Sequence, residues 1–338
     1  MNRSRIEWCD HTWNPITGCM HGCPYCYARK MVTRFSGNIK RNIMETKKFR
    51  MKDDLYILDE QFSEESDNYV LYPFGFAPTY HRYRFDYLDK LKMGNNVFVG
   101  AMADVFGEWI PEEWILEILE LCKERPKHNY LFLTKNPSRY MELAAEGKLP
   151  MEKNFWYGST ITGPEDNFWW SEHHNTFVSI EPLLHPFEVV GSDAVKKVDW
   201  VIIGAETGHR KGKVVPEPEW IETIVEDSRT AGIPVFMKDS LIKIIGEENM
   251  LREFPEELKQ KEASEKVKEK ITGYCMECKK ENKKTDMVAM IARVGRRGKS
   301  STYGYMCKEC FRHFCREHGV EIPELNGLEK AKENETDG

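Results

Sequence analysis

The sequence feature that most restricts the fold is a series of short, continuously apolar runs separated by helix-like stretches. Apolar runs without polar alternation are typical of strands covered on both faces, as in parallel sheets. We therefore predict an α/β fold with a partial parallel (β/α) barrel, and an open doubly wound sheet is the alternative. The predicted strands cover residues 97–102, 130–134, 155–160, 177–180, 200–204 and 234–237.

Two stretches between these runs carry helix signals. Residues 111–125 have apolar residues at helical spacing, and residues 218–231 open with proline and end before Gly232. Cys122 falls in the apolar pattern of the first helix, so we expect a buried, unreactive thiol there. Residues 36–90 mix basic, acidic and aromatic residues without a clear period, and we expect an irregular insertion.

The 338-residue chain is too long for most single cores, and its composition changes near residue 258. Residues 1–258 contain the predicted barrel. Residues 259–272 are almost wholly charged, which predicts a helical linker. A small cysteine-rich module follows at 273–327, and we expect the acidic tail at 328–338 to be disordered.

The overall charge gives no sign of a nucleic-acid binder, because the net charge is -6. A local basic face remains compatible with that total. No run approaches the roughly 18 consecutive apolar residues of a membrane span, and the N-terminus lacks an apolar signal sequence. We expect a cytoplasmic protein without a membrane partner. Thiols stay reduced in the cytoplasm, so the ten cysteines are expected to be metal ligands rather than disulfides.

Three cysteines lie within eight residues, as Cys19, Cys23 and Cys26 in a C-x3-C-x2-C pattern. Closely spaced thiolates on one loop can hold three corners of an iron–sulfur cubane. A four-iron cluster with three protein ligands leaves one iron open, and an open coordination position is useful for catalysis. The alternative is a zinc site on these cysteines together with His21 or His11.

Polar or ionisable residues stand at the ends of six successive predicted strands. The carboxyl ends of parallel barrel strands form the active-site face, so a recurring polar group there indicates a shared cavity. Any single one of these residues is equally compatible with a structural role at an exposed strand end. The residues are Asp104, Lys135, Ser159, Thr160, Glu181, Glu206 and Lys238.

The loop from Cys19 to Cys26 resembles the C-x3-C-x-aromatic-C signature of the radical S-adenosylmethionine superfamily, with Tyr25 at the aromatic position. The wider chain resembles the phage Gp37/Gp68-type (DUF5131) branch, which is similar to spore photoproduct lyase. The matching stretches span about residues 6–258. They are Trp13-Asn14-Pro15, Cys26-Tyr27-Ala28, Leu133-Thr134-Lys135, Ser179-Ile180-Glu181-Pro182, Gly204-Ala205-Glu206-Thr207-Gly208 and Phe254-Pro255.

This resemblance implies that Cys19, Cys23 and Cys26 ligate a [4Fe–4S] cluster whose open iron binds S-adenosylmethionine through its amino and carboxylate groups. Reduction by a donor such as flavodoxin or ferredoxin would cleave the S–C5′ bond. The resulting 5′-deoxyadenosyl radical would abstract hydrogen from a substrate. Tyr25 is expected to lie against the adenine.

The chain departs from the superfamily at one cofactor-binding stretch. Many members carry a Gly-Gly-Glu-like sequence that holds the methionine amine, whereas this chain has Gly100-Ala101-Met102-Ala103-Asp104. We expect Asp104 to take that role, with a helix N-cap as the alternative. Ser159, Glu181 and Glu206 are expected contacts to the ribose, the carboxylate or the substrate.

A second cysteine set near the C-terminus has C-x2-C…C-x2-C spacing. Four thiolates in two such pairs make a closed tetrahedral zinc site, which predicts a zinc-ribbon-like module. A second iron–sulfur cluster is the rival interpretation. Residues 287–293 and 301–306 suit the two strands of a hairpin. The predicted zinc ligands are Cys275, Cys278, Cys307 and Cys310.

Cationic residues around this hairpin suggest a contact to nucleic acid, although a solvated hairpin would look the same. We therefore predict a radical S-adenosylmethionine enzyme acting on a nucleic acid or nucleobase. A peptide or protein substrate, a non-catalytic zinc-containing nucleic-acid-binding protein and a catalytically silent barrel with a cluster are the alternatives. The cationic residues are Lys279, Lys280, Lys283, Lys284, Arg293, Arg296, Arg297 and Lys299.

Overall fold

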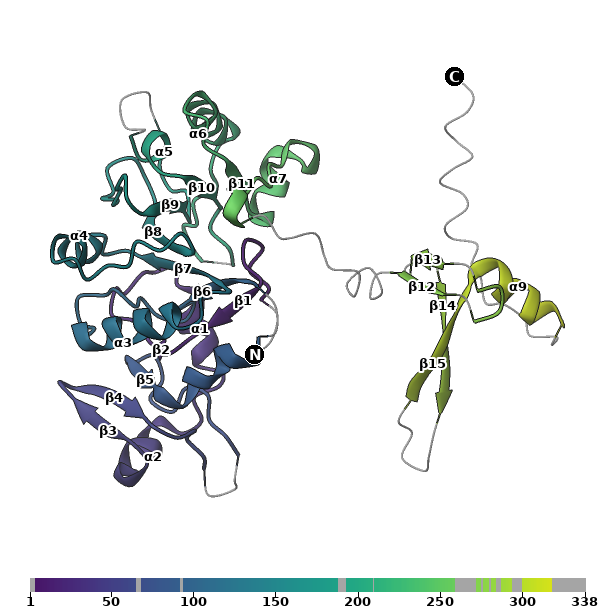
Figure 1. Cartoon of the computed structure of the whole chain (residues 1–338), viewed down its shortest axis with the longest axis horizontal. Coiled ribbons are helices and arrows are strands. Elements are labelled where there is room, and N and C mark those ends of the chain that lie inside the picture. The colour runs from purple at the N-terminus through teal and green to yellow at the C-terminus, as the bar shows by residue number, and fades with distance from the viewer. Residues whose placement is uncertain are drawn as a thin grey trace. The chain divides into compact units, whose positions relative to one another are not determined.

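The chain divides into two compact units, Met1–Lys259 and Gln260–Gly338 (Figure 1). The computed structural model describes most of the first unit and parts of the second. The described residues are 4–64, 68–91, 94–187, 193–208, 210–258, 272–274, 276–279, 281–283, 287–293 and 300–317.

A seven-stranded parallel sheet forms the centre of the first unit. Its spatial order follows the order along the chain, so the sheet never reverses as a doubly wound sheet does. The prediction of a parallel α/β fold is confirmed, the sheet is a half-barrel, and the doubly wound alternative is wrong. The strands are β1 (His11–Trp13), β6 (Asn96–Val99), β7 (Asn129–Thr134), β8 (Phe155–Ile161), β9 (Asn175–Ile180), β10 (Trp200–Ile203) and β11 (Val235–Met237).

Six of these strands coincide with predicted apolar runs, and β1 does not. β1 has only three residues, two of which are the polar His11 and Thr12, so it leaves no apolar run in the sequence. It forms because its backbone pairs in parallel with β6, where His11 lies opposite Val97. This pairing places the chain that follows β1 at the carboxyl edge of the sheet.

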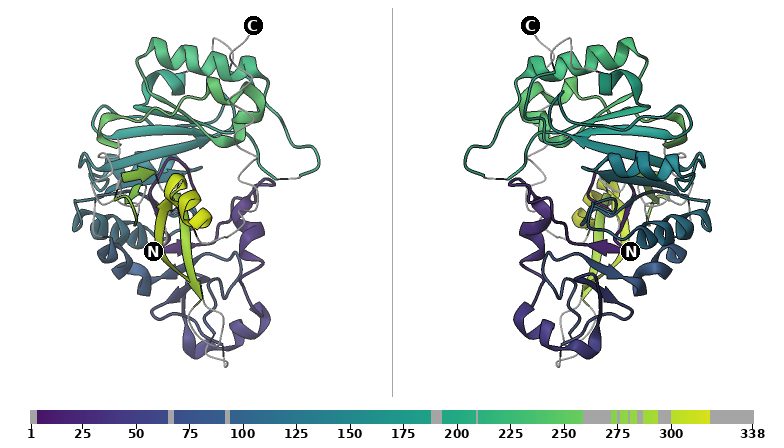
Figure 2. Two further views of the ribbon diagram at one scale, coloured as in Figure 1. Left: turned by 90° about the vertical axis from the view of Figure 1, so that its right-hand side faces the viewer. Right: turned by 90° about the vertical axis from the view of Figure 1, so that its left-hand side faces the viewer.

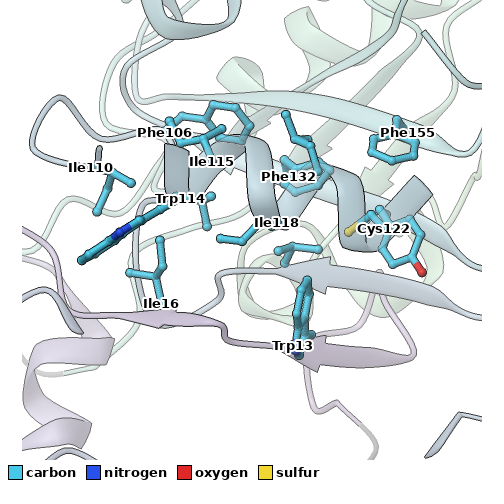
Figure 3. Close-up of a cluster of buried hydrophobic side chains, with 14 of the residues drawn as sticks. Trp13, Ile16, Phe106, Ile110, Trp114, Ile115, Ile118, Cys122, Phe132 and Phe155 are labelled. Atoms are coloured by element: carbon cyan, nitrogen blue, oxygen red, sulfur yellow. The ribbon is translucent and has the colours of Figure 1, made fainter. Parts of the chain in front are cut away.

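Helices cover the outer face of the sheet (Figures 1 and 2). Ile115 and Ile118 of α3 are buried in one apolar cluster with Trp13 and Phe132 (Figure 3). Cys122 is fully buried in the same cluster, and this burial raises the pKa of its thiol well above the ordinary value, as the predicted inert thiol requires. The connecting helices are α3 (Glu112–Lys123), α4 (Ser138–Ala145), α5 (Asp193–Lys197), α6 (Pro218–Thr230) and α7 (Ile242–Ile245).

The inner face carries a second apolar cluster that is rich in aromatic rings. Phe98, Trp156, Phe177 and Trp200 come from four strands and pack together with Trp8 of the N-terminal segment. Their apolar strand neighbours belong to the outer clusters, as expected when successive side chains point to opposite faces. These neighbours are Val97, Val99, Phe155, Tyr157, Val178 and Val201. The aromatic side chains fill the half-barrel near the amino ends of its strands.

The region predicted as an irregular insertion is an ordered subdomain, so that prediction is wrong. A four-stranded sheet in the order β2-β5-β4-β3 organises it around Leu58 and Phe74. Its strands have two to four residues each, and β2 pairs with a strand more than 60 residues away, so no sequence period marks them. Its elements are β2 (Ile16–Thr17), α1 (Tyr27–Val32), α2 (Ile39–Met44), β3 (Arg50–Lys52), β4 (Leu55–Leu58), β5 (Thr79–His81) and the 3-10 helices η1 (Thr46–Lys48) and η2 (Arg82–Lys90).

The second unit contains two antiparallel pairs and a helix. β12 (Thr272–Tyr274) pairs with β13 (Glu281–Lys283), and β14 (Met287–Arg293) pairs with β15 (Ser300–Cys307), which confirms the predicted hairpin strands. α9 (Lys308–Glu317) follows β15 directly. The predicted linker apart from Thr272, the ligand Cys275, residues 318–327 of the predicted module and the predicted tail at 328–338 lie outside the described residues. Every helix in the described part of the chain is too short or too polar to span a bilayer.

Candidate functional site

A cavity of about 370 Å³ lies at the carboxyl ends of the half-barrel strands. Its wall includes Gly100, Leu133, Ser179 and Lys238, each of which stands two residues beyond a member of the inner aromatic and aliphatic cluster. Residues two apart on a strand share a face, so these side chains lie above the cluster. Bulky rings therefore close the half-barrel below, and smaller or polar side chains leave room above.

The three cysteines of the C-x3-C-x2-C pattern all line this cavity and are partly buried. The loop that carries them begins at Gly18, whose N–H donates to the Met102 carbonyl at 2.9 Å. Gly18 has a φ of +87°, and a Cβ there would lie 2.4 Å from the Ala77 oxygen, so only glycine fits. The loop ends at Cys26, whose Sγ accepts the Arg29 N–H at 3.4 Å.

The sulfurs of this loop do not form the compact group of three donors that a single zinc ion requires. Around a tetrahedral zinc with Zn–S bonds of 2.3 Å, neighbouring sulfurs stand about 3.8 Å apart. The described residues contain one group of three donor atoms within 4.8 Å of one another, and it lies in the C-terminal unit rather than on this loop. Burial raises the pKa of Cys19 to about 12, so ligation there must release a proton.

Asp104 fastens the cysteine loop to the sheet. Its Oδ2 lies 2.7 Å from His21 Nε2 and accepts the Lys135 N–H at 2.9 Å. Its Oδ1 accepts the Phe106 N–H at 3.1 Å. The carboxylate is buried and lines the cavity, yet these three contacts give it a structural role. From the sequence, the structural alternative for Asp104 was a helix N-cap. The contact to Asp104 occupies Nε2 of His21, one of the two ring nitrogens that could bind a zinc ion.

Tyr25 and Lys135 meet at the cysteine side of the cavity. The Lys135 ammonium lies 5.5 Å from the centre of the Tyr25 ring, within the range of a cation–π contact. Burial lowers the pKa of Lys135, while the nearby Cys23 and Asp104 act in the opposite direction. A cation therefore stands beside the thiols, where it would favour their ionised form.

The wall formed by the ends of β9 and β11 carries an ion pair and a hydroxyl group without a hydrogen-bond partner among the described residues. Lys238 at the end of β11 pairs with Glu181 beyond β9, and its ammonium lies 4.0 Å from Glu7 Oε2. Ser179 is fully buried in this wall, and no atom of the described residues hydrogen-bonds its Oγ. Ser179 and Glu7 were not predicted as site residues, although the two-residue spacing of Ser179 and Glu181 on one strand placed both on the same face.

Glu206 lines the cavity from the segment after β10, and the loop after β10 lies on the same side of the sheet as α1 (Figure 2). Its two oxygens accept from Arg210 Nε and Nη2 at 2.7 Å each. This bidentate pair lowers the pKa of Glu206. Glu206 is therefore an ionised wall residue whose charge is already paired.

Ser159 does not reach the cavity. Its Oγ accepts the Trp169 N–H at 3.0 Å, and the residue is fully buried. Thr160, one position further along β8, lines the cavity instead. A strand turns successive side chains to opposite faces, so a shift of one residue moves a predicted contact from the inner face to the outer one.

A second metal-competent cluster lies in the C-terminal unit. Cys278, Cys307 and Cys310 hold their sulfurs within 4.8 Å of one another. The Cys278 and Cys307 sulfurs are 3.9 Å apart, close to the edge of a tetrahedral zinc site. Cys307 ends β15, and Cys310 lies in the first turn of α9. The structure thus brings together three of the four predicted zinc ligands, and Cys275 lies outside the described residues.

These features define an α/β protein with a parallel half-barrel and a cysteine-lined cavity at the carboxyl ends of its strands. Residues 3–283 match the model of the family described as "Protein of unknown function (DUF5131)", so the chain belongs to this family. Among solved structures, the chain is similar to a spore photoproduct lyase mutant with bound AdoMet and dinucleoside spore photoproduct. The similarity has 9% identity and a TM-score of 0.32 and covers 90% of this chain and 71% of that chain. No curated protein matches the sequence.

Proposed function

We propose that this protein is a radical S-adenosylmethionine enzyme with a [4Fe–4S] cluster on Cys19, Cys23 and Cys26. One observation carries the proposal. The three thiols of a C-x3-C-x2-C loop line a single cavity at the carboxyl edge of a parallel half-barrel. When bound, the cluster supplies the electron that cleaves the S–C5′ bond of S-adenosylmethionine and so generates a 5′-deoxyadenosyl radical.

The chain's own residues prepare this site. The Asp104–His21 contact fixes the loop, and a fixed loop holds three thiols in one geometry for a cluster whose fourth corner stays open. Tyr25 supplies a ring surface beside the thiols for the adenine. The aromatic cluster beneath the cavity closes its floor to water, which protects a reactive intermediate from side reactions.

The cavity wall provides polar groups for the rest of the bound molecule. The Ser179 hydroxyl lacks a partner among the described residues, as expected of a group that a ligand satisfies. Lys135 and Lys238 are suited to a carboxylate, and Glu181 is suited to an amine or ribose hydroxyls. We assign Glu206 to the same wall, where its contact with Arg210 makes its carboxylate less available to a ligand.

For the C-terminal unit, we propose a structural zinc ion on Cys278, Cys307 and Cys310, with Cys275 as the fourth ligand. The 3.9 Å separation of two of these sulfurs favours a single ion over a second iron–sulfur cluster. The substrate in this proposal is a nucleic acid or nucleobase. That choice rests on the cationic residues between 279 and 299, whose side chains, apart from Lys279, lie outside the described part of the chain.

Anaerobic purification followed by a cleavage assay tests the proposal. We expect a brown protein with about four iron atoms per chain that releases 5′-deoxyadenosine after reduction with dithionite and addition of S-adenosylmethionine. The Cys23→Ala variant should release none. An intact, reduced cluster that yields no 5′-deoxyadenosine would refute the catalytic proposal, and zinc in place of iron would refute the cluster. Incubation with oligonucleotides and with peptides, followed by mass spectrometry, separates the two substrate classes.

A further inference from the structure

A groove of about 680 Å³ lies between α1 and α2, beside the cysteine loop. Residues of both helices, of the turn that joins them and of the segment before β5 line it. The described residues that line it include two cations, Arg29 and Lys40, and no aspartate or glutamate. A groove with cations and without carboxylates on its walls attracts a ligand that carries negative charge.

The charge of the segment that builds this groove is opposite to that of the whole chain. Residues 11–44 contain five lysines and arginines but no aspartate or glutamate, in a protein with a net charge of -6. Lys30 and Lys40 are exposed, and no carboxylate of the described residues pairs with either ammonium group. Glu64 brings one carboxylate near Gly37, where a Cβ would lie 2.6 Å from its Oε1. The surplus charge at the groove is therefore positive.

The turn between the two helices adds polar groups to the wall. Gly37 is exposed and has a φ of +60°, and its missing side chain lets another backbone approach closely. Asn38 follows it, and its Oδ1 accepts the Arg41 N–H at 3.2 Å. This contact leaves the amide nitrogen of Asn38 as a hydrogen-bond donor. Lysine, arginine and asparagine side chains are common donors to phosphate oxygens.

Phe76 joins the groove to the cysteine-lined cavity, because its side chain lines both. The Arg29 guanidinium lies 4.6 Å from the centre of the Phe76 ring. Arg29 Nη2 also donates to the Cys19 carbonyl at 3.2 Å. The stacked pair of Arg29 and Phe76 therefore forms the boundary between the groove and the thiol loop. A long ligand can lie in the groove while one of its parts enters the cavity.

We propose that this groove binds the sugar–phosphate backbone of a single-stranded nucleic acid, next to the nucleotide whose base enters the cavity. The inference rests on the proposed function and decides between its two substrate forms, because a free nucleobase has no backbone to fill the groove. Cationic grooves with aromatic rings beside them are typical of single-strand binding, since cations pair with phosphates and rings stack on bases. The rings here are Phe76 and Phe35, which is 50% exposed. A base inside a duplex would first have to leave its stack to reach the cavity.

The test measures binding of a fluorescein-labelled oligothymidylate to the anaerobic, iron-loaded, full-length protein by fluorescence anisotropy at several salt concentrations. About twelve nucleotides suffice for one binding site of this kind. The Lys30→Gln and Lys40→Gln double variant removes two exposed charges and leaves the core intact. Each phosphate contact to a single strand contributes about 0.7 to the slope of log K against log salt, so we expect the slope to fall by about 1.4. Binding at low salt should weaken roughly tenfold or more.

The matched control removes two exposed charges elsewhere, with Lys127→Gln and Lys153→Gln, which lie before β7 and β8 at the amino edge of the sheet. We expect wild-type affinity and slope in this control. Equal weakening in both double variants, or no weakening in either, would overturn the groove assignment. So would displacement of the oligonucleotide by thymidine at the same nucleotide concentration. A polyglutamate peptide of equal charge that binds more tightly than the oligonucleotide would also overturn it and would indicate an acidic protein partner.

Binding requires neither a reductant nor S-adenosylmethionine, so the groove and the proposed function can fail separately. Weakened binding in the Lys30/Lys40 variant, in a protein that releases no 5′-deoxyadenosine, would support the groove and refute only the proposed function. Normal release of 5′-deoxyadenosine with unchanged binding in that variant would refute only the groove.

Discussion

The two cysteine sets of this chain differ both in sequence spacing and in surroundings. Cys19, Cys23 and Cys26 lie on a loop at the wall of a cavity, with Lys135 and Tyr25 beside them. Cys278, Cys307 and Cys310 lie within 4.8 Å of one another on short elements of a small unit. The first set leaves space next to its thiols, while the second set converges on a point.

This difference indicates two kinds of metal chemistry. Converging thiolates saturate one ion, and such closed sites contribute folding energy. Thiolates that hold a larger group beside a cavity leave coordination space for a second molecule. The first unit also has an extensive core of its own, so it does not need a metal for its fold. We therefore propose a catalytic role for the N-terminal set and a stabilising role for the C-terminal set.

The largest expected effect comes from Cys23→Ala. Loss of one of three ligands should remove the cluster and reduce 5′-deoxyadenosine release to the uncatalysed level, because no electron reaches S-adenosylmethionine. Zinc content should stay the same. Metal analysis and chromatography of the reaction products measure both. If Cys23→Ala lost zinc as well, the two sets would not be separate sites.

The mirror experiment is Cys307→Ala. We expect loss of zinc and unfolding of the C-terminal unit, because metal binding contributes about 10–16 kcal/mol in zinc-finger peptides. Iron content and reductive cleavage should persist, since the described residues that line the cavity belong to the first unit. Limited proteolysis with mass spectrometry reports the unfolding. A C-terminal unit that stays protease-resistant without zinc would contradict the structural role.

A smaller effect is expected from Asp104→Asn, which preserves size but removes the negative charge that faces His21. Partners that orient metal ligands typically contribute 10–100-fold to metal affinity or activity, and we expect a loss in that range for iron retention under a chelator challenge. Asp199→Asn is the control, because Asp199 likewise accepts the Thr176 N–H at 2.7 Å but lies before β10. An equal iron loss in both variants would point to general destabilisation.

The strands of the half-barrel were predictable because each buried strand is a continuous apolar run, and its helices carry clear start and stop signals. β1 was not predicted because a three-residue strand with two polar residues has no hydrophobic period. The subdomain between residues 16 and 90 was not predicted for a related reason. Its strands are stabilised by partners distant in the sequence, and such tertiary pairing overrides weak local signals.

The sequence predicted which strand ends carry candidate site residues, but not which side chains there face the cavity. Glu181 and Lys238 reach the cavity as their positions indicated, whereas Ser159 points away and its neighbour Thr160 points inward. In a continuously apolar strand, neither face is marked by polar alternation, so sequence alone cannot tell the two apart. The contact of Asp104 with His21 joins residues 83 positions apart and leaves no local pattern.

The smallest expected effect is a loss of thermal stability in a cavity-wall variant, without a change at either metal site. Glu206 has a pKa lowered by its bidentate contact with Arg210, so the ion pair stabilises the folded state above the pKa of the unfolded chain, near 4.3. That contribution is lost as the pH falls through the lowered folded-state pKa. We expect Glu206→Gln to melt a few degrees below wild type at pH 7, and the gap to narrow on acidification below about pH 4. Iron and zinc contents should stay unchanged, and Glu217→Gln, an exposed change on the same segment, should melt like wild type. A gap that persisted unchanged in acid would show that the amide disturbs packing rather than an ion pair.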